Sequence, residues 1–371
     1  MTWVTLATNM IEFFIAWELM LVPSYFLILF WGFPETRKRT ALKFWLYTQS
    51  GAVCILIGFG LLYAQGGSFV LANIVANGDL IFKIIFILLA AGFLVKMAVF
   101  PIHWWLPPVH AEAPTPISVL LSGAMIETGA YALVRFGTLT LYEAAVYLAF
   151  PVAALGVITM FYGGFMALAQ LDIKRLLAYS SVSQMGYVLF ALGTTTIFGV
   201  SGGMFHLINH AFSKGLLFMT AGAVIHQTGL RDIKKMGGLS NKMPITAFAA
   251  AIGMMSIAGS PPLSGFASEW LMFLGGFQAA IPIPGAGVNL GFLILTILAV
   301  SSSILSAAYM LRFFWRVFLG PHPEELEDVK ESPRSMTIPM IVLGVLIVIF
   351  GIFPSLALDV IVPAFAGILG P

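Results

Sequence analysis

The sequence predicts an all-α, polytopic membrane protein with about ten transmembrane helices. Hydrophobic residues occupy 60% of its 371 positions and charged residues only 9%, whereas soluble domains contain roughly 25% charged residues. One helical crossing needs about 20 apolar residues, and the apolar stretches are separated by short segments with charged residues, glycine and proline. This composition leaves room for about ten crossings and excludes a sizeable soluble domain.

Ten apolar stretches are the candidate spans. In chain order they are Val4 to Phe30, Phe44 to Tyr63, Ile81 to Pro107, Pro114 to Leu139, Ala144 to Ala169, Ala178 to Ile197, Gly202 to His226, Pro244 to Phe277, Leu290 to Leu319 and Met336 to Val362. The first stretch has no basic residue before its apolar core and contains Glu12 and Glu18. A cleaved signal peptide has the opposite pattern, so we interpret this stretch as the first span.

Lysine and arginine lie in alternate loops, and this alternation predicts the orientation of the chain. The loops after spans 1, 5, 7 and 9 contain basic residues, whereas those after spans 2, 6 and 8 contain none. Basic residues are retained on the cytoplasmic side. We therefore expect a multi-pass protein of a prokaryotic cytoplasmic membrane, with both termini outside and the loop from Arg37 to Lys43 in the cytoplasm.

Two spans contain prolines that must interrupt the helix. Pro101 follows Lys96 in the third span, and the Pro261-Pro262 pair precedes Glu269 in the eighth. Proline removes a backbone donor and clashes with the preceding turn, and backbone freed at membrane depth is tolerated only against protein or water. A packing kink would explain either break alone. Because the breaks lie five spans apart, we expect inverted five-helix repeats whose broken helices contribute to ion sites.

Ionisable side chains inside the spans need an explanation, because one at the bilayer centre costs about 2.5 to 3.5 kcal/mol on insertion scales. They are Glu12, Glu18, Lys96, His103, Glu127, Arg135, His206, His210, Lys214, Glu269, Arg312 and Arg316. His206, His210 and Lys214 recur every four residues and therefore share one helix face. Lysine, glutamate and histidine all exchange protons when their pKa values lie near neutrality, so such a face is suited to conduct protons.

Simpler interpretations exist for part of this set. Glu12, Arg135 and Arg316 lie near span ends, from which a long side chain reaches the membrane interface. Glu18 with Lys96 would also fit a purely structural ion pair, and the histidines of the seventh span would fit ordinary packing.

Metal and cofactor sites are not predicted. His103 and His110 flank a tryptophan- and proline-rich turn, but no third metal ligand is evident. The single cysteine, Cys54, cannot form an iron–sulfur site or a disulfide within the chain. The net charge of +2 gives no indication of a nucleic-acid partner.

Four segments carry a resemblance to one protein family. They are Trp17 to Pro23 (WELMLVP), Lys96 to Thr115 with the motifs FPIHWWLP and HAEAPT, Asp172 to Ser181 (DIKRLLAYSS) and Pro261 to Phe266 (PPLSGF). With these motifs the chain resembles the antiporter-like subunits of respiratory complex I, most closely the M-type subunit. Similar subunits belong to membrane-bound hydrogenases, archaeal sulfur-reducing complexes and multisubunit sodium/proton antiporters.

The resemblance implies two inverted five-helix repeats, and about four N-terminal helices of the family are expected to be absent here. Residues 1–140 would then form a first, incomplete repeat with its broken helix at 96–107. Residues 141–320 would form the second repeat with its broken helix at 258–270, and residues 321–371 a loop and the last span.

The family also implies roles for individual residues. Glu18 would modulate Lys96, the lysine of the first broken helix. Glu269 takes the position of the ionisable residue in the second broken helix, and His210 and Lys214 match the water path between the two.

Two positions depart from the family pattern. Glu127 stands where many members have the lysine that receives the proton from the first broken helix, and Gln184 stands where M-type subunits often have histidine. The predicted ion pathway comprises Glu18, Lys96, Glu127, His206, His210, Lys214 and Glu269, with His103 and Arg312 as accessory residues.

The predicted function is translocation of protons or sodium ions by a subunit of a redox-driven membrane complex. The chain is expected to have no cofactor, metal or catalytic centre of its own. Expected partners are other membrane subunits, peripheral redox subunits of the same complex and bilayer lipid. Two alternatives stay open, a subunit of a multisubunit sodium/proton antiporter and a structural subunit that has lost conduction.

Overall fold

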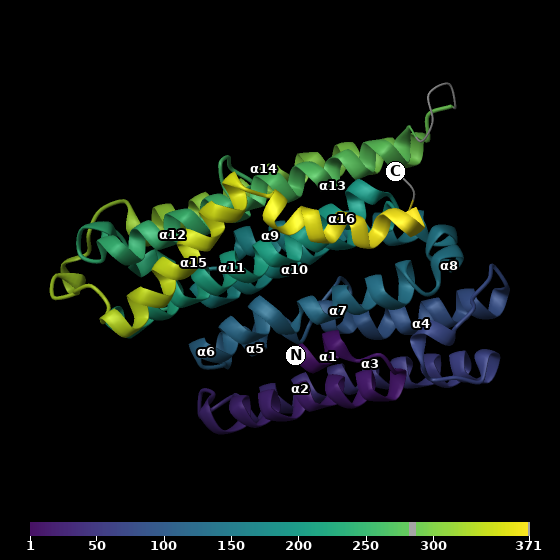
Figure 1. Cartoon of the computed structure of the whole chain (residues 1–371). Helices are drawn as coiled ribbons and strands as arrows, with labels where there is room; N and C mark the ends of the chain where they lie inside the picture. Colours follow the sequence, from purple (N-terminus) through teal and green to yellow (C-terminus); the bar gives the residue numbers. More distant parts are fainter. Residues whose placement is uncertain (282–286, 370–371) are drawn as a thin grey trace.

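Long helices packed side by side make up the structure, a computed structural model that describes residues 1–281 and 287–369 (Figure 1). Eight of the described helices are long and apolar enough to cross a membrane. They are α2 (Met10–Trp31), α3 (Arg37–Gly66), α4 (Leu80–Met97), the segment Thr115–Thr138 with α6 (Thr115–Leu120) and α7 (Glu127–Ala132), α9 (Ala149–Ala169), α10 (Ile173–Gly193), α14 (Leu290–Phe318) and α15 (Arg334–Ile352).

Two further crossings complete the described bundle. Helix α11 (Ile197–Thr228) has 32 residues, and its hydropathy is lowered by the polar residues along one face. Helices α12 (Pro244–Ile257) and α13 (Ser264–Ala280) follow one another across a short break. The eight long apolar helices, α11 and the α12–α13 pair account for the ten predicted spans. Many isoleucine, leucine, valine and phenylalanine side chains remain exposed on the outside of the bundle, as expected where lipid is the solvent.

Both predicted helix breaks are present. Helix α4 ends at Met97, and helical structure resumes with α5 (Leu106–Glu112). The Trp105 indole nitrogen donates to the Val95 carbonyl at 2.9 Å, which satisfies an acceptor at the end of α4. The second break is shorter than the expected 258–270, because the chain is helical again from Ser264. The assignment of the two halves as inverted repeats stays a prediction.

The two ends of the chain differ from the predicted spans. The first span begins at Met10, not Val4, because Asn9 caps α2 by accepting from the Ile11 backbone nitrogen at 2.8 Å. The preceding α1 (Thr2–Leu6) carries the N terminus back toward the middle of the bundle (Figure 1). The expectation that both termini lie outside stays a prediction. The last span is also divided, since α15 ends before Pro354 and α16 (Ser355–Leu369) follows it.

Helix α10 lies at the centre of the fold, and all residues of its apolar window are buried. It begins at Ile173, earlier than predicted, because the Asp172 carboxylate accepts from the Arg175 backbone nitrogen at 2.9 Å. Glycines allow its backbone to approach α9 closely, since a Cβ atom on Gly186 would lie 2.6 Å from the Met160 nitrogen. Small residues commonly permit such close packing of membrane helices.

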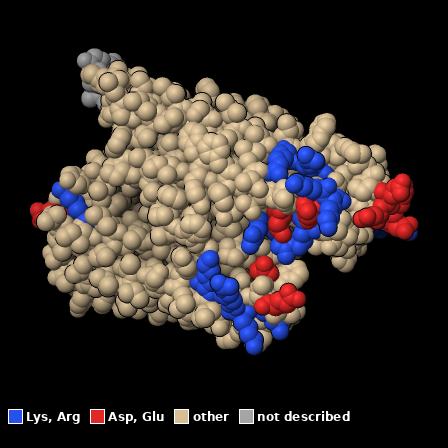
Figure 2. All heavy atoms as spheres, turned by 180° about the vertical axis from the view of Figure 1, so that it is seen from behind, with Lys and Arg blue, Asp and Glu red and all other residues tan. Residues whose placement is uncertain are grey.

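Basic residues gather at one end of the bundle (Figure 2). Arg231 connects several loops at this end, because its guanidinium lies 2.7 Å from the Asp172 carboxylate and 5.0 Å from the centre of the Phe33 ring. These residues follow α11, precede α10 and follow α2. The loops that the sequence predicts to be cytoplasmic therefore lie together, on one side of the bundle.

This arrangement predicts the accessibility of two loops. In a chain whose single cysteine is replaced (Cys54→Ser), we expect a membrane-impermeant maleimide to label Asn77→Cys but not Thr36→Cys in sealed right-side-out vesicles. The reason is that Thr36 lies at the basic end and Asn77 in the loop at the opposite end. Inverted vesicles should give the reverse pattern, and labelling of Thr36→Cys from outside would overturn the orientation.

Candidate functional site

A row of polar side chains on α11 forms the centre of the candidate site. His206, Asn209, His210, Ser213 and Lys214 are spaced three or four residues apart, and all are fully buried. Residues with this spacing share one face of a helix, which confirms the common face that the sequence predicts for the two histidines and the lysine. Each member of the row is held by groups from other helices.

Glu127 and His210 join the two halves of the chain. The Glu127 carboxylate on α7 lies 3.0 Å from Nδ1 of His210, and 13% of the Glu127 side chain is exposed. Helix α7 is flanked by two wider helical turns, at Leu121–Met125 and Leu133–Thr138. In the first of them the Ile126 backbone nitrogen donates to the Leu121 carbonyl at 3.1 Å. Such π-type turns often occur at functional sites, and here they bracket the carboxylate.

His206 has a hydrogen-bond partner at each ring nitrogen. Nδ1 lies 2.9 Å from the Ser268 hydroxyl on α13, and Nε2 lies 2.7 Å from the Gln184 side-chain oxygen on α10. The rings of His206 and His210 are 6.5 Å apart, measured between their centroids. The two imidazoles are therefore neighbours that do not hydrogen-bond directly.

Lys214 is held by neutral groups. Its ammonium donates to the Leu177 carbonyl at 3.2 Å and to the Ser180 hydroxyl, both on α10. No carboxylate among residues 1–281 and 287–369 forms a salt bridge with this lysine. Its hydrogen bonds compensate part of the cost of burying an ammonium group.

Asn209 connects α11 to both sides of the α12–α13 break. Its side-chain oxygen accepts from Ser256 at 2.7 Å and from Ser264 at 2.6 Å, and Ser213 lies within 3.1 Å. Ser256 is near the end of α12 and Ser264 begins α13. We call these four residues the Asn209 cluster; it fixes the two helix ends relative to each other.

Glu269 lies against the α12–α13 break and is almost fully buried. Ser303 donates to its Oε2 at 3.5 Å, and Oε1 has no partner in the described part of the chain. Gly259 in the break leaves the space for this carboxylate, since a Cβ atom there would lie 2.5 Å from Oε2. Gly259 also has φ of +66°, a conformation that favours glycine.

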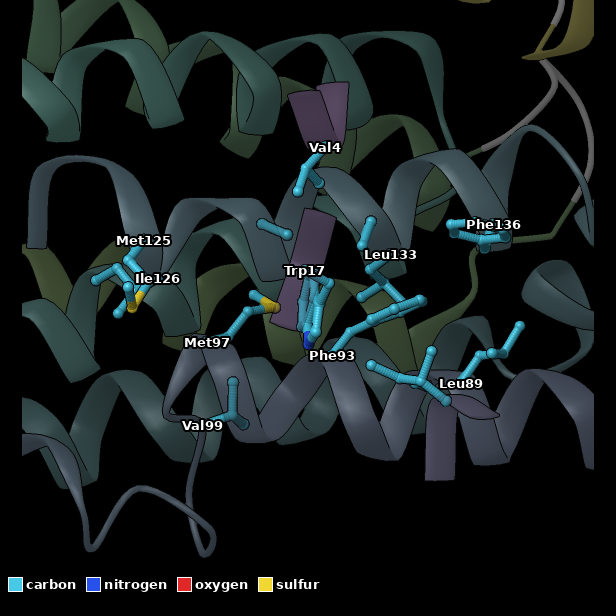
Figure 3. Packing of buried hydrophobic residues seen from close by; sticks show 14 of the residues in the cluster. Val4, Trp17, Leu89, Phe93, Met97, Val99, Met125, Ile126, Leu133 and Phe136 are labelled. Carbon is cyan, nitrogen blue, oxygen red and sulfur yellow. The ribbon is translucent and has the colours of Figure 1, made fainter. Parts of the chain in front are cut away.

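Lys96 is buried in the last turn of α4 beside aromatic rings. Its ammonium lies 5.2 Å from the centre of the Trp17 ring, and Trp17 packs on Phe93 with ring centroids 5.7 Å apart (Figure 3). Glu18 instead accepts from the Gln49 amide at 2.7 Å. Glu18 and Lys96 are therefore not ion-paired here, so the structural ion pair considered from the sequence is not formed.

The accessory residues lie apart from the α11 row. His103 lies 3.2 Å from the Tyr162 hydroxyl through Nε2, and Arg312 donates to the Leu168 carbonyl. Arg135 donates to backbone carbonyls of α1, including Thr5 at 3.2 Å; that it reaches the membrane interface stays a prediction. Glu12 accepts from the Trp3 indole at 2.7 Å.

A group of hydroxyls near Gln184 was not anticipated from the sequence. Tyr187 lies 2.8 Å from Ser302 and 3.2 Å from Ser306, and Tyr309 lies 3.1 Å from Ser306. All four are buried between α10 and α14. The sequence does contain an indication of this group, because Ser302, Ser306 and Tyr309 recur at helical spacing and therefore share one face. These residues are neutral, so a prediction based on ionisable side chains does not include them.

The arrangement is suited to proton transfer. Two imidazoles and an amine follow one another along α11, and the Glu127 carboxylate on α7 contacts the second imidazole. Each of these groups can accept or release a proton. Helix α7 touches α4 close to Lys96, because a Cβ atom on Gly129 would lie only 3.1 Å from the Met97 backbone nitrogen. Lys96 therefore belongs to an element in contact with the one that carries Glu127.

Comparison with known proteins gives consistent results. Residues 7–311 match the family described as NADH:quinone oxidoreductase/Mrp antiporter, transmembrane region. The chain is 37% identical, over 99% of its length, to a Na(+)/H(+) antiporter subunit of Alkalihalophilus pseudofirmus. It is 38% identical, over 95% of its length, to an NAD(P)H-quinone oxidoreductase chain 4 of Trichormus variabilis. It spans 48% of the first relative and 66% of the second, about half to two thirds of their lengths.

Solved structures show the same fold. A chain of the membrane-bound sulfane sulfur reductase, an archaeal respiratory membrane complex, matches with a TM-score of 0.83 and 33% identity, over 94% of this chain and 57% of that one. A chain of respiratory complex I from Thermus thermophilus matches with a TM-score of 0.87 and 29% identity, over 98% of this chain and 76% of that one.

The Asn209 cluster predicts a change in stability. Asn209→Leu should lower the free energy of unfolding by about 2 to 3 kcal/mol, because the buried Ser256 and Ser264 hydroxyls lose their acceptor. The melting temperature of the detergent-solubilised protein measures the change. Asn209→Asp keeps an acceptor at the same place and should lose much less. Equal melting temperatures for Asn209→Leu and the parent would show that the cluster does not hold the break.

The space beside Gly259 predicts a second effect. Gly259→Ala should destabilise the protein by about 1 to 2 kcal/mol through its left-handed backbone conformation, and its methyl group should displace the Glu269 carboxylate. Thermal unfolding and vesicle transport assays measure the two effects. Gly60→Ala on α3 is the matched control, because nothing lies within 4 Å of the added methyl group. A Gly259→Ala protein with the stability and transport rate of the parent would contradict the conclusion that Gly259 leaves the space for the Glu269 carboxylate.

Proposed function

The chain belongs to the NADH:quinone oxidoreductase/Mrp antiporter transmembrane family, and from that premise we propose that it is an ion-translocating subunit of a multisubunit membrane complex. One observation carries the proposal, the buried row of proton-exchanging groups on α11 with Glu127 of α7 bonded to it. Burying such groups inside a membrane protein is expensive, and they typically mark ion pathways.

The chemistry of the row favours protons over sodium ions. Lysine and protonated histidine carry positive charge and no free lone pair, so they repel a metal cation rather than bind it. Lys214 lies one turn from His210, and both are fully buried. Sodium sites need several oxygen ligands around one point. We therefore propose protons as the ions that move along α11.

Lys96 and Glu127 would form the link to the first broken helix. No hydrogen bond joins them in the residues that the structure describes, so a proton transfer between them requires water or movement of a side chain. The packing of α4 on α7 near Met97 supports this link. Glu18 would act by its distance from Lys96, because a nearby carboxylate favours the charged ammonium.

The partners follow from the relatives. The two solved chains described above belong to respiratory complexes. We therefore propose that this chain assembles with other membrane subunits and with peripheral redox subunits in a prokaryotic cytoplasmic membrane. The identity to a Na(+)/H(+) antiporter subunit supports a second candidate, a complex without redox subunits. Proton transport that depends on an electron donor would support the first assignment; transport driven only by a sodium gradient would support the second.

Lys96 provides the decisive test. Lys96→Ala should leave the complex assembled and its electron transfer to an artificial acceptor intact, while proton pumping into vesicles falls to near background. Lys96→Arg should fail likewise, since a guanidinium does not release its proton. Assembly should survive, because Lys96 has no carboxylate partner in the described residues that its removal would leave unpaired. Pumping is measured with a pH-sensitive dye in sealed vesicles.

Lys83→Ala is the matched control, because Lys83 lies on the same helix and stacks over the Tyr147 ring at 4.0 Å near the opposite end. It should pump like the parent protein. If an assembled Lys96→Ala complex pumps normally, the proposed ion-translocating function is wrong.

A further inference from the structure

His206 differs from its neighbour His210 in how its ring nitrogens are engaged. Both nitrogens of His206 have partners within 2.9 Å, whereas Nε2 of His210 has none in the described residues. A neutral imidazole has one donor nitrogen and one acceptor nitrogen, and the partners decide which is which. The partners of His206 therefore determine where this ring can take up a proton.

Gln184 defines the Nε2 side. Its side-chain oxygen faces His206 at 2.7 Å, and its amide nitrogen faces Tyr309 at 3.3 Å and Ser306 at 3.4 Å. An amide oxygen only accepts hydrogen bonds, so Nε2 must carry the hydrogen. In the neutral ring Nδ1 is then without hydrogen.

Ser268 defines the Nδ1 side and is adaptable. Its hydroxyl lies 2.9 Å from Nδ1 and also 2.9 Å from the Gly265 carbonyl on the preceding turn of α13. Toward a neutral His206 the hydroxyl can donate to Nδ1. Toward a protonated ring the oxygen can accept from Nδ1 and the hydroxyl can donate to Gly265. Both protonation states are hydrogen-bonded after a rotation of one hydroxyl group.

We propose that Gln184 is a positioning residue that holds His206 as the Nε2–H tautomer, so that His206 gains and loses its mobile proton only at Nδ1. This inference rests on the proposed proton-translocating function. In the step, the Ser268 hydroxyl turns from Nδ1 toward the Gly265 carbonyl, and a hydronium ion gives a proton to the freed Nδ1 lone pair and leaves as neutral water. The Nε2–H bond stays intact. Release reverses these changes.

The consequence is a direction for proton exchange. Nδ1 faces α13, where Ser268 precedes Glu269 in the sequence, whereas Nε2 faces the hydroxyls of Tyr187, Ser302, Ser306 and Tyr309 through Gln184. A side-chain amide does not readily gain or lose a proton. Gln184 therefore separates these hydroxyls from the proton path. His206 therefore exchanges its mobile proton on the side that faces α13.

The tautomer can be observed directly. The full chain has six histidines, so nitrogen-15 labelling of histidine and solid-state NMR in proteoliposomes gives few signals, and His206→Gln identifies the signal of His206. We expect the Nε2–H tautomer in the parent protein. In Gln184→Met, which has similar size but no acceptor, the ratio of Nε2–H to Nδ1–H tautomers should fall roughly three- to tenfold, the effect of losing one neutral hydrogen bond.

Two matched variants serve as controls. Gln184→Glu keeps an oxygen toward Nε2, so the Nε2–H bond should persist. Tyr309→Phe removes a partner of the Gln184 amide nitrogen but leaves its oxygen in place, so the tautomer should not change. An Nδ1–H tautomer in the parent protein, or an unchanged tautomer ratio in a folded Gln184→Met, overturns the proposal.

Transport assays on two variants distinguish a failure of this inference from a failure of the proposed function. Gln184→Met should translocate protons at least about tenfold more slowly, because a histidine in the wrong tautomer presents the wrong nitrogen. Normal transport by Gln184→Met with a changed tautomer would overturn the positioning role and leave the proposed function standing. Normal transport by Lys96→Ala would overturn the proposed function whatever the tautomer of His206.

Discussion

The structure depends on one constraint, that a polar side chain inside an apolar bundle must find its hydrogen bonds within the protein. The polar face of α11 meets this constraint in large part through neighbours from several helices, although Nε2 of His210 and the amide nitrogen of Asn209 have no partner among the described residues. Glu127 comes from α7, Gln184 from α10, and Ser268 from α13. The central position of α10, the wide turns around α7 and the small residues at close contacts all serve to bring these partners to one face.

The same constraint applies to the broken helices. Each break frees backbone groups, and side-chain hydrogen bonds stabilise both breaks. The Trp105 indole donates to the Val95 carbonyl at the first break. At the second, Asn209 accepts from serines on both sides. The breaks are thus fixed in position, and the carboxylate of Glu269 rests in the space that a glycine leaves open.

Local features of the sequence predicted much of this arrangement. Apolar length indicated the spans, proline the breaks, and four-residue spacing the face of α11, because each depends on neighbouring residues alone. The contacts between helices could not be predicted in the same way. His210 contacts Glu127, 83 positions away, and Arg135 donates to the Thr5 carbonyl of α1, 130 positions away. Such pairs depend on the packing of helices that are far apart in the sequence. Several of the partners are also neutral, so no charge in the sequence indicates them.

The choice of neutral partners has a consequence for conduction. Lys214 is held by a carbonyl and a hydroxyl, His206 by an amide and a hydroxyl, and Glu269 by a hydroxyl. A buried ion pair would resist a change of protonation, because neutralising one partner leaves the other as an uncompensated charge at a cost of about 3 to 5 kcal/mol. A hydroxyl can donate or accept, so it follows the change by rotating. Partners that are neutral and adaptable would therefore allow these groups to be buried and still to exchange protons, as the proposed function requires.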